Sequence, residues 1–508
     1  TYGHRFLSEG KIEVNSVSDY INKLKENKVI LNNEERKELI KSQLQQAAQS
    51  LNAEVVISEE LLDEVNQLVE FPSPVIGGFD DKYLEVPEIV NVTVMRSHQR
   101  YFPLFKDGKL LPNFITVSNM NLNPDNIRKG NQRVLKARLD DASFYYQEDL
   151  KKNLEDHTEE LKRVTYFEEV GSIFDKTQRI EKIALELASK YFKDIEPANI
   201  SRAAQILKSD LVTNMVKEFT ELQGEIGYYY SIRESENEEI SYALKEQYLP
   251  TGNNENFPSR PLSQLINFSD KLDNLVVSFS LGKIPTGSKD PFSLRRQSLG
   301  ILKTCDQYNI PLNLEDALDT AFDVLSAQKT IKADKAETIS KIKEFFTQRL
   351  KNDLLERGIR YDVIDSVLDT GSNFDNLYSL QEKARTLDTW VKNDIETIVM
   401  ALARVIRISK EKPENAVQES LFEKDEEKAL YSSIKDLNSS LSQFDNDYNY
   451  SAYIEKVSEL VNPINKFFDN VMVMVEDQEV KKNRLALLYE IKNISDKVGN
   501  MDKLVFSA

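Results

Sequence analysis

Cysteine and histidine are scarce in this sequence of 508 residues, which has one cysteine, Cys305, and three histidines, His4, His98 and His157. A single cysteine forms no disulfide within the chain and builds no cysteine-based metal cage. Free thiols are the rule in a reducing compartment, so we expect a cytoplasmic protein.

Long apolar runs are also missing. No window holds about 18 consecutive apolar residues, which excludes a membrane-spanning helix. Glycine and proline are few, at 16 and 15 residues, while hydrophobic residues make up 40% and charged residues 30%. This composition excludes fibrous and low-complexity chains and indicates a helix-rich globular protein. The length is sufficient for roughly three domains.

Positive charge is in deficit. The chain has 66 lysines and arginines against 84 aspartates and glutamates, a formal net charge of −18. The field of the whole molecule therefore opposes a general attraction to nucleic acid or to anionic lipid. We expect neither DNA nor a membrane as a partner, and any contact with RNA has to come from local basic patches.

Common catalytic motifs are absent. The sequence contains no Walker loop, no G-x-S-x-G and no cysteine in a nucleophile motif. We therefore predict no catalytic residue, no metal and no cofactor in this chain.

The periodicity of apolar residues divides the chain into a mixed front and a helical rear. Residues 11–70 have helical spacing. Three β-rich stretches follow, Ile89–Met95, Arg100–Phe105 and Phe114–Ser118, and Asp107-Gly108 between the last two is a strong hairpin signal. Helical periodicity resumes near Gln132 and continues to the end. The predicted fold class is mainly α with an α+β N-terminal part.

Four segments, in this order and spacing, carry a family resemblance. The first is T-Y-G-H-R-F-L at 1–7, and the second covers 79–119, with F-D-D-K-Y-L, then M-R-S-H-Q-R-Y-F, then F-I-T-V-S-N. The third is P-T-G-S-K-D-P-F-S-L-R-R at 285–296, and the fourth covers 467–485, with F-F-D-N-V-M-V-M followed by N-R-L. Together they resemble the glycyl-tRNA synthetase β-subunit family over essentially the whole chain. Family members carry a substantial region before the first segment. We therefore expect this chain, which starts at Thr1, to be a piece of a longer protein.

The resemblance implies a multidomain, non-catalytic subunit that binds glycine tRNA and recognises its anticodon. It implies an α+β tRNA-binding module over 1–130, a helical domain of the HD type over 131–335 and a helical anticodon-binding domain over 336–508. The family works as an α₂β₂ assembly, in which the α subunit activates glycine with ATP and Mg²⁺. Catalysis is thus expected in the α subunit of a glycine-tRNA ligase.

Within the HD-type domain, the resemblance places four residues at metal-ligand positions. Active HD enzymes hold a divalent metal with histidines and aspartates, and the metal activates water. Here Arg179 and Ser209 replace the two histidines, while Asp210 and Asp270 remain. We expect the Arg179 guanidinium to replace the metal by reaching Asp210, Asp270 or both, with Ser209 donating a hydrogen bond nearby. The alternative function, a metal-dependent HD-type phosphohydrolase, needs a complete ligand set. A scaffold that binds only protein is a third possibility.

Two basic groups are candidates for tRNA binding. Lys129, Arg133 and Lys136 recur at spacings of four and three, so they share one helical face, suited to RNA phosphate, to an acidic partner or simply to solvent. Lys289, Arg295 and Arg296 surround Asp290-Pro291, which predicts a capped helix with proline at its first position. These arginines either bind phosphate bidentately or bridge acidic neighbours within the domain.

A third basic group lies on a predicted amphipathic helix over 479–488. We expect Lys481, Lys482 and Arg484 to project outward, with Leu485 and Leu488 in the core. Glycine anticodons end in two cytosines, and nearby Glu476 and Asp477 are suitable acceptors for a cytosine edge. For Phe467 and Phe468 we favour helix packing over base stacking.

Overall fold

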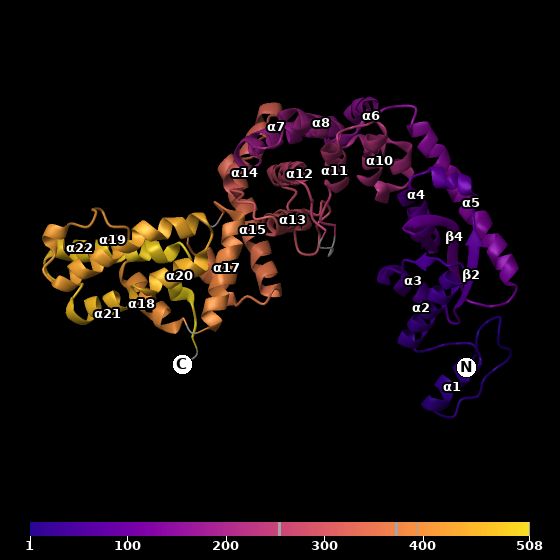
Figure 1. The fold of residues 1–508 in the computed structure, drawn as a ribbon, viewed down its shortest axis with the longest axis horizontal. Helices are drawn as coiled ribbons and strands as arrows, with labels where there is room; N and C mark the ends of the chain where they lie inside the picture. Colours follow the sequence, from indigo (N-terminus) through magenta and orange to yellow (C-terminus); the bar gives the residue numbers. More distant parts are fainter. Residues whose placement is uncertain (252–255, 371–373, 394, 507–508) are drawn as a thin grey trace. The chain divides into compact units, whose positions relative to one another are not determined.

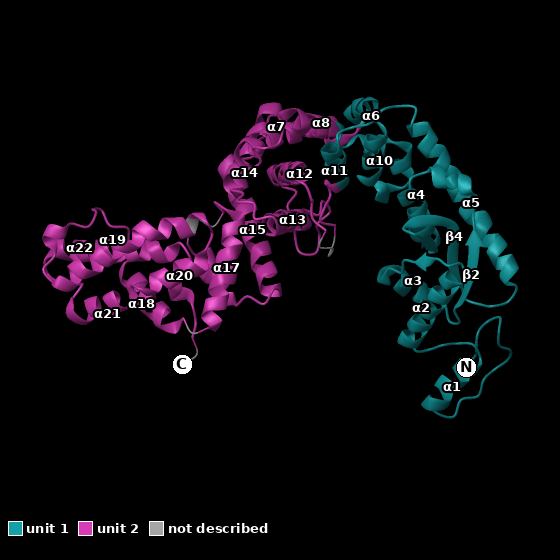
Figure 2. Cartoon of the chain, in the orientation of Figure 1, with its two compact units in different colours: residues 1–163, 206–245 teal, residues 164–205, 246–508 magenta. Residues whose placement is uncertain are grey.

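The computed structural model describes residues 1–251, 256–370, 374–393 and 395–506. The chain is mostly helical with a small antiparallel sheet, and it forms two compact units (Figure 2). Unit 1 comprises residues 1–163 and 206–245, and unit 2 comprises 164–205 and 246–508. These units differ from the three predicted ranges, because residues 131–335 are divided between the two. No helix within the described ranges is long and apolar enough to cross a membrane.

Unit 1 opens with the predicted helices. These are α1 (Val17–Glu26), α2 (Asn33–Gln49) and α3 (Glu59–Leu68). Each is capped at its N-terminus by a side-chain oxygen, from Ser16, Asn32 and Ser58 respectively, which accepts from a backbone N–H in the first turn. Such caps satisfy donors that have no partner inside the helix.

The sheet of unit 1 has four antiparallel strands in the order β1-β3-β4-β2. They are β1 (Glu54–Val55), β2 (Ser73–Gly78), β3 (Phe102–Lys106) and β4 (Lys109–Ser118). The predicted hairpin turn is confirmed, since β3 and β4 join at Asp107 and Gly108, whose φ values are +50° and +73°. The core between the sheet and helices α2 and α3 includes Leu44, Leu62 and Ile115, all fully buried.

The predicted strand over 89–95 is wrong. The segment forms α4 (Glu88–Thr93), which continues as a π turn, η2 (Val94–His98). Val90 and Val94, four residues apart, are both fully buried. The buried Asn91 amide donates to the Tyr83 carbonyl at 2.8 Å. Burial on one helical face thus overrides the β preference of the branched side chains.

Helix α5 (Pro124–Asp149) is the longest element of unit 1 and packs against β2 (Figure 1). It starts eight residues before the predicted resumption at Gln132, with Pro124 in its first turn, where proline needs no hydrogen-bond partner. The remaining elements of unit 1 are η1 (Asp81–Glu85), α6 (Leu154–Glu160), η3 (Leu161–Arg163), η4 (Ser209–Val212), α9 (Asn214–Glu218), η5 (Thr220–Leu222), α10 (Glu225–Arg233) and α11 (Glu238–Glu246).

Unit 2 is built around α12 (Pro261–Ser280), which is buried on nearly every side. Its buried residues include charged and polar side chains, such as Asn267, Asp270 and Asp273, beside the apolar ones. The helix packs on α7 (Ile173–Tyr191), α13 (Leu294–Gln307), α14 (Leu314–Gln328) and α15 (Lys335–Glu356). A short hairpin of β5 (Thr165–Phe167) and β6 (Gly171–Ser172) precedes α7, and α8 (Pro197–Ile206) follows it.

The C-terminal part of unit 2 is a helical bundle. Helices α16 (Tyr361–Leu368) and α17 (Leu377–Lys392) lead into it. The bundle comprises α18 (Glu396–Ile408), α19 (Asp425–Asn446), α20 (Tyr450–Ser458), α21 (Val461–Asn470) and α22 (Gln478–Asp496), with the short turns η6 (Glu419–Leu421) and η7 (Met501–Lys503) (Figure 1).

Candidate nucleic-acid interface

The outer face of α5 presents cations of two kinds. Lys136 pairs with Asp140 at 2.6 Å, and Arg128 and Arg138 also pair with carboxylates. Lys129 and Arg133 are exposed and have no ion-pair or hydrogen-bond partner for their side chains among the described residues. The predicted face is therefore present, but only Lys129 and Arg133 have unpaired charges, while Lys136 is held by Asp140.

Asp290 organises the start of α13. Its two carboxylate oxygens accept from the backbone N–H groups of Leu294 and Arg295, both at 2.9 Å. Asp290 thus binds the first turn of the helix, but the helix begins at Leu294 with Ser293 at the N-cap position. The prediction that Asp290 directly precedes the helix and that Pro291 occupies its first position is therefore wrong. Three residues separate Asp290 from Leu294, the first residue of the helix, and the Asp290-Pro291 pattern did not predict this separation.

The predicted phosphate ligands of this loop have different environments. Arg295 donates to the Gly287 carbonyl at 2.7 Å and so closes the loop. Lys289 and Arg296 are exposed, with no side-chain partner within the described ranges. Burial together with nearby Arg295 lowers the pKa of the Arg349 guanidinium. The loop is therefore a cationic surface, with Arg295 holding the loop in shape.

Arg484 does not project outward from α22, contrary to the prediction. It is buried, and its Nε and Nη2 atoms donate to the two carboxylate oxygens of Glu427 at 2.9 and 3.2 Å. It also donates to Glu423 at 2.9 Å and to the Met472 carbonyl at 3.1 Å. Arg484 lies four residues after buried Val480, on the core-facing side of the helix. Its role is therefore to neutralise a buried carboxylate.

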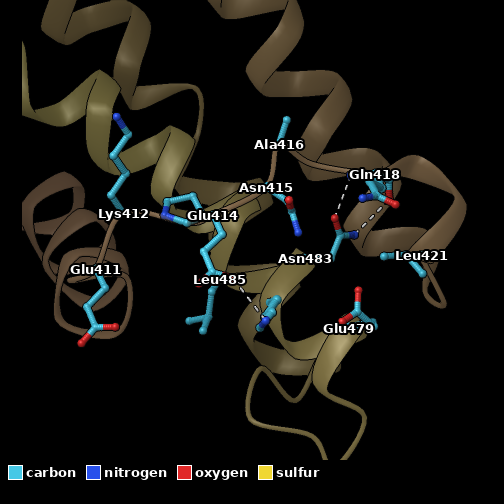
Figure 3. Close-up of a pocket in the computed structure, with 12 residues that line it drawn as sticks. Glu411, Lys412, Glu414, Asn415, Ala416, Gln418, Leu421, Glu479, Asn483 and Leu485 are labelled. Carbon is cyan, nitrogen blue, oxygen red and sulfur yellow. Dashed lines mark hydrogen bonds and ion pairs between the residues drawn. The ribbon is translucent and has the colours of Figure 1, made fainter.

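A pocket lies beside the first turns of α22 (Figure 3). Its wall is fixed by Asn483, whose amide accepts from the Gln418 N–H at 2.7 Å and donates to the Gln418 carbonyl at 3.0 Å. Lys482 pairs with Glu414 at 3.4 Å, whereas Glu479 is exposed. The residues that line it are Glu411, Lys412, Pro413, Glu414, Asn415, Ala416, Gln418, Leu421, Glu479, Lys482, Asn483 and Leu485.

Other residues singled out in the C-terminal bundle have structural roles. Asp477 caps α22 through one oxygen, which accepts from the N–H groups of Glu479 and Val480. Phe467 is fully buried and packs edge-on against Phe468 at 5.5 Å between ring centroids. Packing rather than base stacking is confirmed for Phe467. Lys481 is half-buried and Leu488 is in the core, while Leu485 is only half-buried at the pocket.

A buried ionic cluster joins α7 and α12 inside unit 2. Arg179 donates to both oxygens of Asp273 at 2.6 and 3.1 Å, and the Lys176 ammonium lies 2.7 Å from Asp270 and 3.0 Å from Asp273. An arginine-centred charge cluster on Asp210, Asp270 or both was predicted. Within unit 2 the carboxylate that Arg179 binds is Asp273, and Asp270 pairs with Lys176 instead. Asp270 and Asp273 are three residues apart, so they share one face of α12 and face two cations that share one face of α7.

Ser209 and Asp210 have their own environment in unit 1. The Ser209 hydroxyl donates to the Ile206 carbonyl at 2.8 Å and lies 2.8 Å from the Thr158 hydroxyl. One oxygen of Asp210 accepts from the Gly224 N–H, and the other has no hydrogen-bond partner in the described part of the chain. Burial raises the pKa of Asp210 to about 6. Both residues therefore have partners of their own within unit 1, and their contact with Arg179 stays a prediction.

The chain is similar in sequence to known protein families and to individual proteins over nearly its whole length. A family model described as "Glycyl-tRNA synthetase beta subunit" matches residues 1–369, and one described as "DALR anticodon binding domain" matches 398–498. A protein of Clostridioides difficile named glycine-tRNA ligase beta subunit is 39% identical over 508 residues, which cover 100% of this chain and 73% of the relative. Proteins of the same name from Bacillus subtilis and Aquifex aeolicus are 38% and 39% identical over 99% of this chain, and the matches cover 73% and 72% of their own lengths.

Proposed function

Because this chain belongs to the glycyl-tRNA synthetase β-subunit family, we propose that it is the tRNA-binding, anticodon-recognising subunit of a glycine-tRNA ligase. The main support for the proposal is that the two family matches follow one another along the chain. The β-subunit match covers unit 1 and the α12-centred part of unit 2, and the anticodon-binding match falls on the bundle from α18 to α22. In this proposal, the chain supports charging of glycine tRNA by holding the RNA.

The chemistry of the ligase is assigned to a partner. The α subunit activates glycine, using ATP and Mg²⁺, and the two kinds of subunit form an α₂β₂ assembly in the cytoplasm. The candidate residues of this chain fit binding rather than catalysis, because they are exposed cations, caps and buried ion pairs. The family comparisons do not favour an HD-type phosphohydrolase.

We propose that the middle of the chain keeps the helical arrangement of an HD-type domain without its metal site. The support is the pair of cations, Lys176 and Arg179, that compensates Asp270 and Asp273. Two carboxylates buried side by side need compensating positive charge. In metal-dependent enzymes a metal ion supplies it. In this chain two side chains do so, which leaves the helical arrangement available for binding RNA or the α subunit.

The α22 pocket is the proposed place where an anticodon cytosine is recognised. A glutamate accepts a hydrogen bond from the cytosine N4 amine, and such a base contact contributes about 1–3 kcal/mol of discrimination. Glu479 and Lys482 both line the pocket and are exposed. The ion pair of Lys482 with Glu414 is long, at 3.4 Å, and the ammonium is proposed to exchange this partner for phosphate. The two residues are therefore expected to act differently, one on specificity and one on affinity.

We expect Glu479→Ala to reduce the preference for glycine tRNA over an anticodon-swapped tRNA by roughly 5- to 150-fold, because the acceptor for the cytosine amine is lost. Lys482→Ala should weaken the binding of both tRNAs alike, since a phosphate contact carries no sequence information. Filter binding to both tRNAs measures the two effects. Glu455→Ala, an exposed acid on α20 of the same bundle, is the matched control. An unchanged preference in Glu479→Ala would remove this pocket from anticodon recognition.

A further inference from the structure

A groove in unit 1 lies where the end of β2, the turn η1 and the start of β4 meet α5. It has a volume of about 650 Å³, within the range of about 300–1,000 Å³ typical of small-molecule sites. Its lining residues are Gly78, Phe79, Asp80, Tyr83, Pro112, Asn113, Gln132, Arg133 and Lys136. Phe79, Asp80 and Tyr83 lie in the F-D-D-K-Y-L segment that carries the family resemblance, whereas no role was predicted for the side chains of Asn113 and Gln132.

The walls of the groove are held rigidly. Tyr83 is buried and donates its hydroxyl to Asp140, which also binds Lys136 at 2.6 Å. The Asp80 carboxylate is occupied as a cap, since it accepts from the Lys82 N–H at 3.0 Å. The Asp140 charge is therefore paired with a cation, whereas Asp80 keeps its negative charge and is held in place by its backbone contact.

Two amide side chains provide acceptors in the groove. Gln132 donates its Nε2 to the Gly78 carbonyl at 2.9 Å, and Asn113 donates its Nδ2 to the Gly77 carbonyl at 3.4 Å. These bonds hold both side chains in place and use one N–H donor of each amide. The two amide oxygens accept no hydrogen bond from any described residue. They are therefore available to a ligand that carries an N–H donor.

An aromatic ring and unpaired cations complete the site. Phe79 is half-buried and packs edge-on against Tyr83, with ring centroids 6.4 Å apart, so its orientation is fixed. Arg133 lines the groove, and Lys129 lies one helical turn before it on α5, a rise of about 6 Å. Both cations are exposed and unpaired among the described residues. Stacking rings beside a line of cations are the elements that bind single-stranded nucleic acid.

We propose that this groove binds one unpaired nucleotide of an RNA chain, with the base against Phe79 and its phosphate on Arg133. The amide oxygens of Asn113 and Gln132 accept from the exocyclic amine of the base, so adenine, cytosine and guanine are favoured over uracil. Lys129 lies outside the groove and meets the next phosphate, which favours RNA over a free nucleotide. The inference rests on the proposed function, because it assigns part of tRNA binding to unit 1.

The test uses the full chain and short labelled RNA oligonucleotides of cytidine or of uridine, with free CMP as a competitor. We expect tighter binding of oligocytidine than of oligouridine, and weak competition by CMP. Phe79→Leu should weaken oligocytidine binding roughly 5- to 100-fold, since stacking is lost while the packing on Tyr83 is kept. Arg133→Ala should weaken both oligonucleotides alike and lower the salt dependence of binding.

The matched control is Arg138→Ala, which removes an α5 arginine that pairs with Glu218 outside the groove, and it should bind as the unaltered chain does. Unchanged oligonucleotide binding in both Phe79→Leu and Arg133→Ala would overturn the inference. So would CMP binding as tight as that of the oligonucleotide. If both variants bind the oligonucleotides as tightly as the unaltered chain does, and the chain still prefers glycine tRNA by its anticodon, the groove assignment fails and the proposed function stands.

Discussion

Replacing Arg179 with alanine should lower the free energy of unfolding by about 3–5 kcal/mol, because a buried carboxylate would lose its bidentate partner. Asp273 and Arg179 are both fully buried. Although burial works against ionisation, Lys176 and Arg179 hold the pKa of Asp273 below its usual value of 3.8. Without the guanidinium, the single Lys176 ammonium would have to compensate Asp270 and Asp273 together.

The measurement is urea denaturation followed by tryptophan fluorescence. The only tryptophan, Trp390, lies on α17 in unit 2, so its emission reports the unit that contains the cluster. Lys190→Ala is the matched control, since Lys190 is on the same helix and pairs with Asp316 at the surface. It should cost less than about 1 kcal/mol. A loss below about 1 kcal/mol in Arg179→Ala would contradict the assigned role.

The pH dependence of this effect has a definite sign. A carboxylate with a depressed pKa in the folded state contributes stability above its unfolded pKa, and that stability is lost as the pH falls through the folded pKa. The destabilisation by Arg179→Ala should therefore be largest near neutral pH. The destabilisation should shrink as the pH falls into the acidic range, because a protonated Asp273 no longer needs the counter-charge that the guanidinium supplies.

Arg484→Ala should destabilise the C-terminal bundle by a similar amount, about 3–5 kcal/mol. Glu427 is fully buried and also accepts from the backbone N–H groups of Glu423 and Lys424. Removal of the arginine leaves this carboxylate without a full counter-charge. Thermal unfolding monitored by Trp390 fluorescence and circular dichroism measures the loss, and half-buried Lys481→Ala on the same helix is the control.

The same variant separates a structural role from an RNA contact. At a temperature where Arg484→Ala remains folded, its preference for glycine tRNA over an anticodon-swapped tRNA should equal that of the unaltered chain. Adding Glu427→Gln to an Arg484→Met variant should recover part of the stability, because the buried charge is removed while the backbone acceptor is kept. A lost anticodon preference in a fully stable Arg484→Ala protein would instead place this arginine at the RNA.

Features encoded by neighbouring residues could be predicted from the sequence. The turn at Asp107-Gly108 needs two positive φ values, which Asp and Gly adopt at low cost, so the pattern specifies the hairpin. The strand predicted over 89–95 failed because β-branched residues also pack well when one helical face is buried. The outward position predicted for Arg484 failed because charge alone suggested exposure, while its buried partner, Glu427, is 57 residues away in the sequence.

Contacts between distant segments explain the other differences. Residues 206–245 belong to unit 1, where Asp149 accepts from Asn214, from the Met215 N–H and from the Tyr230 hydroxyl across 65 to 81 residues. No local pattern indicates such a network. The pairing of Arg179 with Asp273 was within reach of sequence reasoning, since the spacing of Asp270 and Asp273 places both carboxylates on one face of a helix.

In the proposed function, this chain itself recognises glycine tRNA by its anticodon. The most direct measurement compares the dissociation constants of the unaltered chain for glycine tRNA and for the same tRNA with both anticodon cytosines replaced. We predict that the first binds at least roughly 5-fold more tightly at the same salt concentration, since each base contact contributes about 1–3 kcal/mol. Equal dissociation constants for the two RNAs would contradict anticodon recognition by this chain.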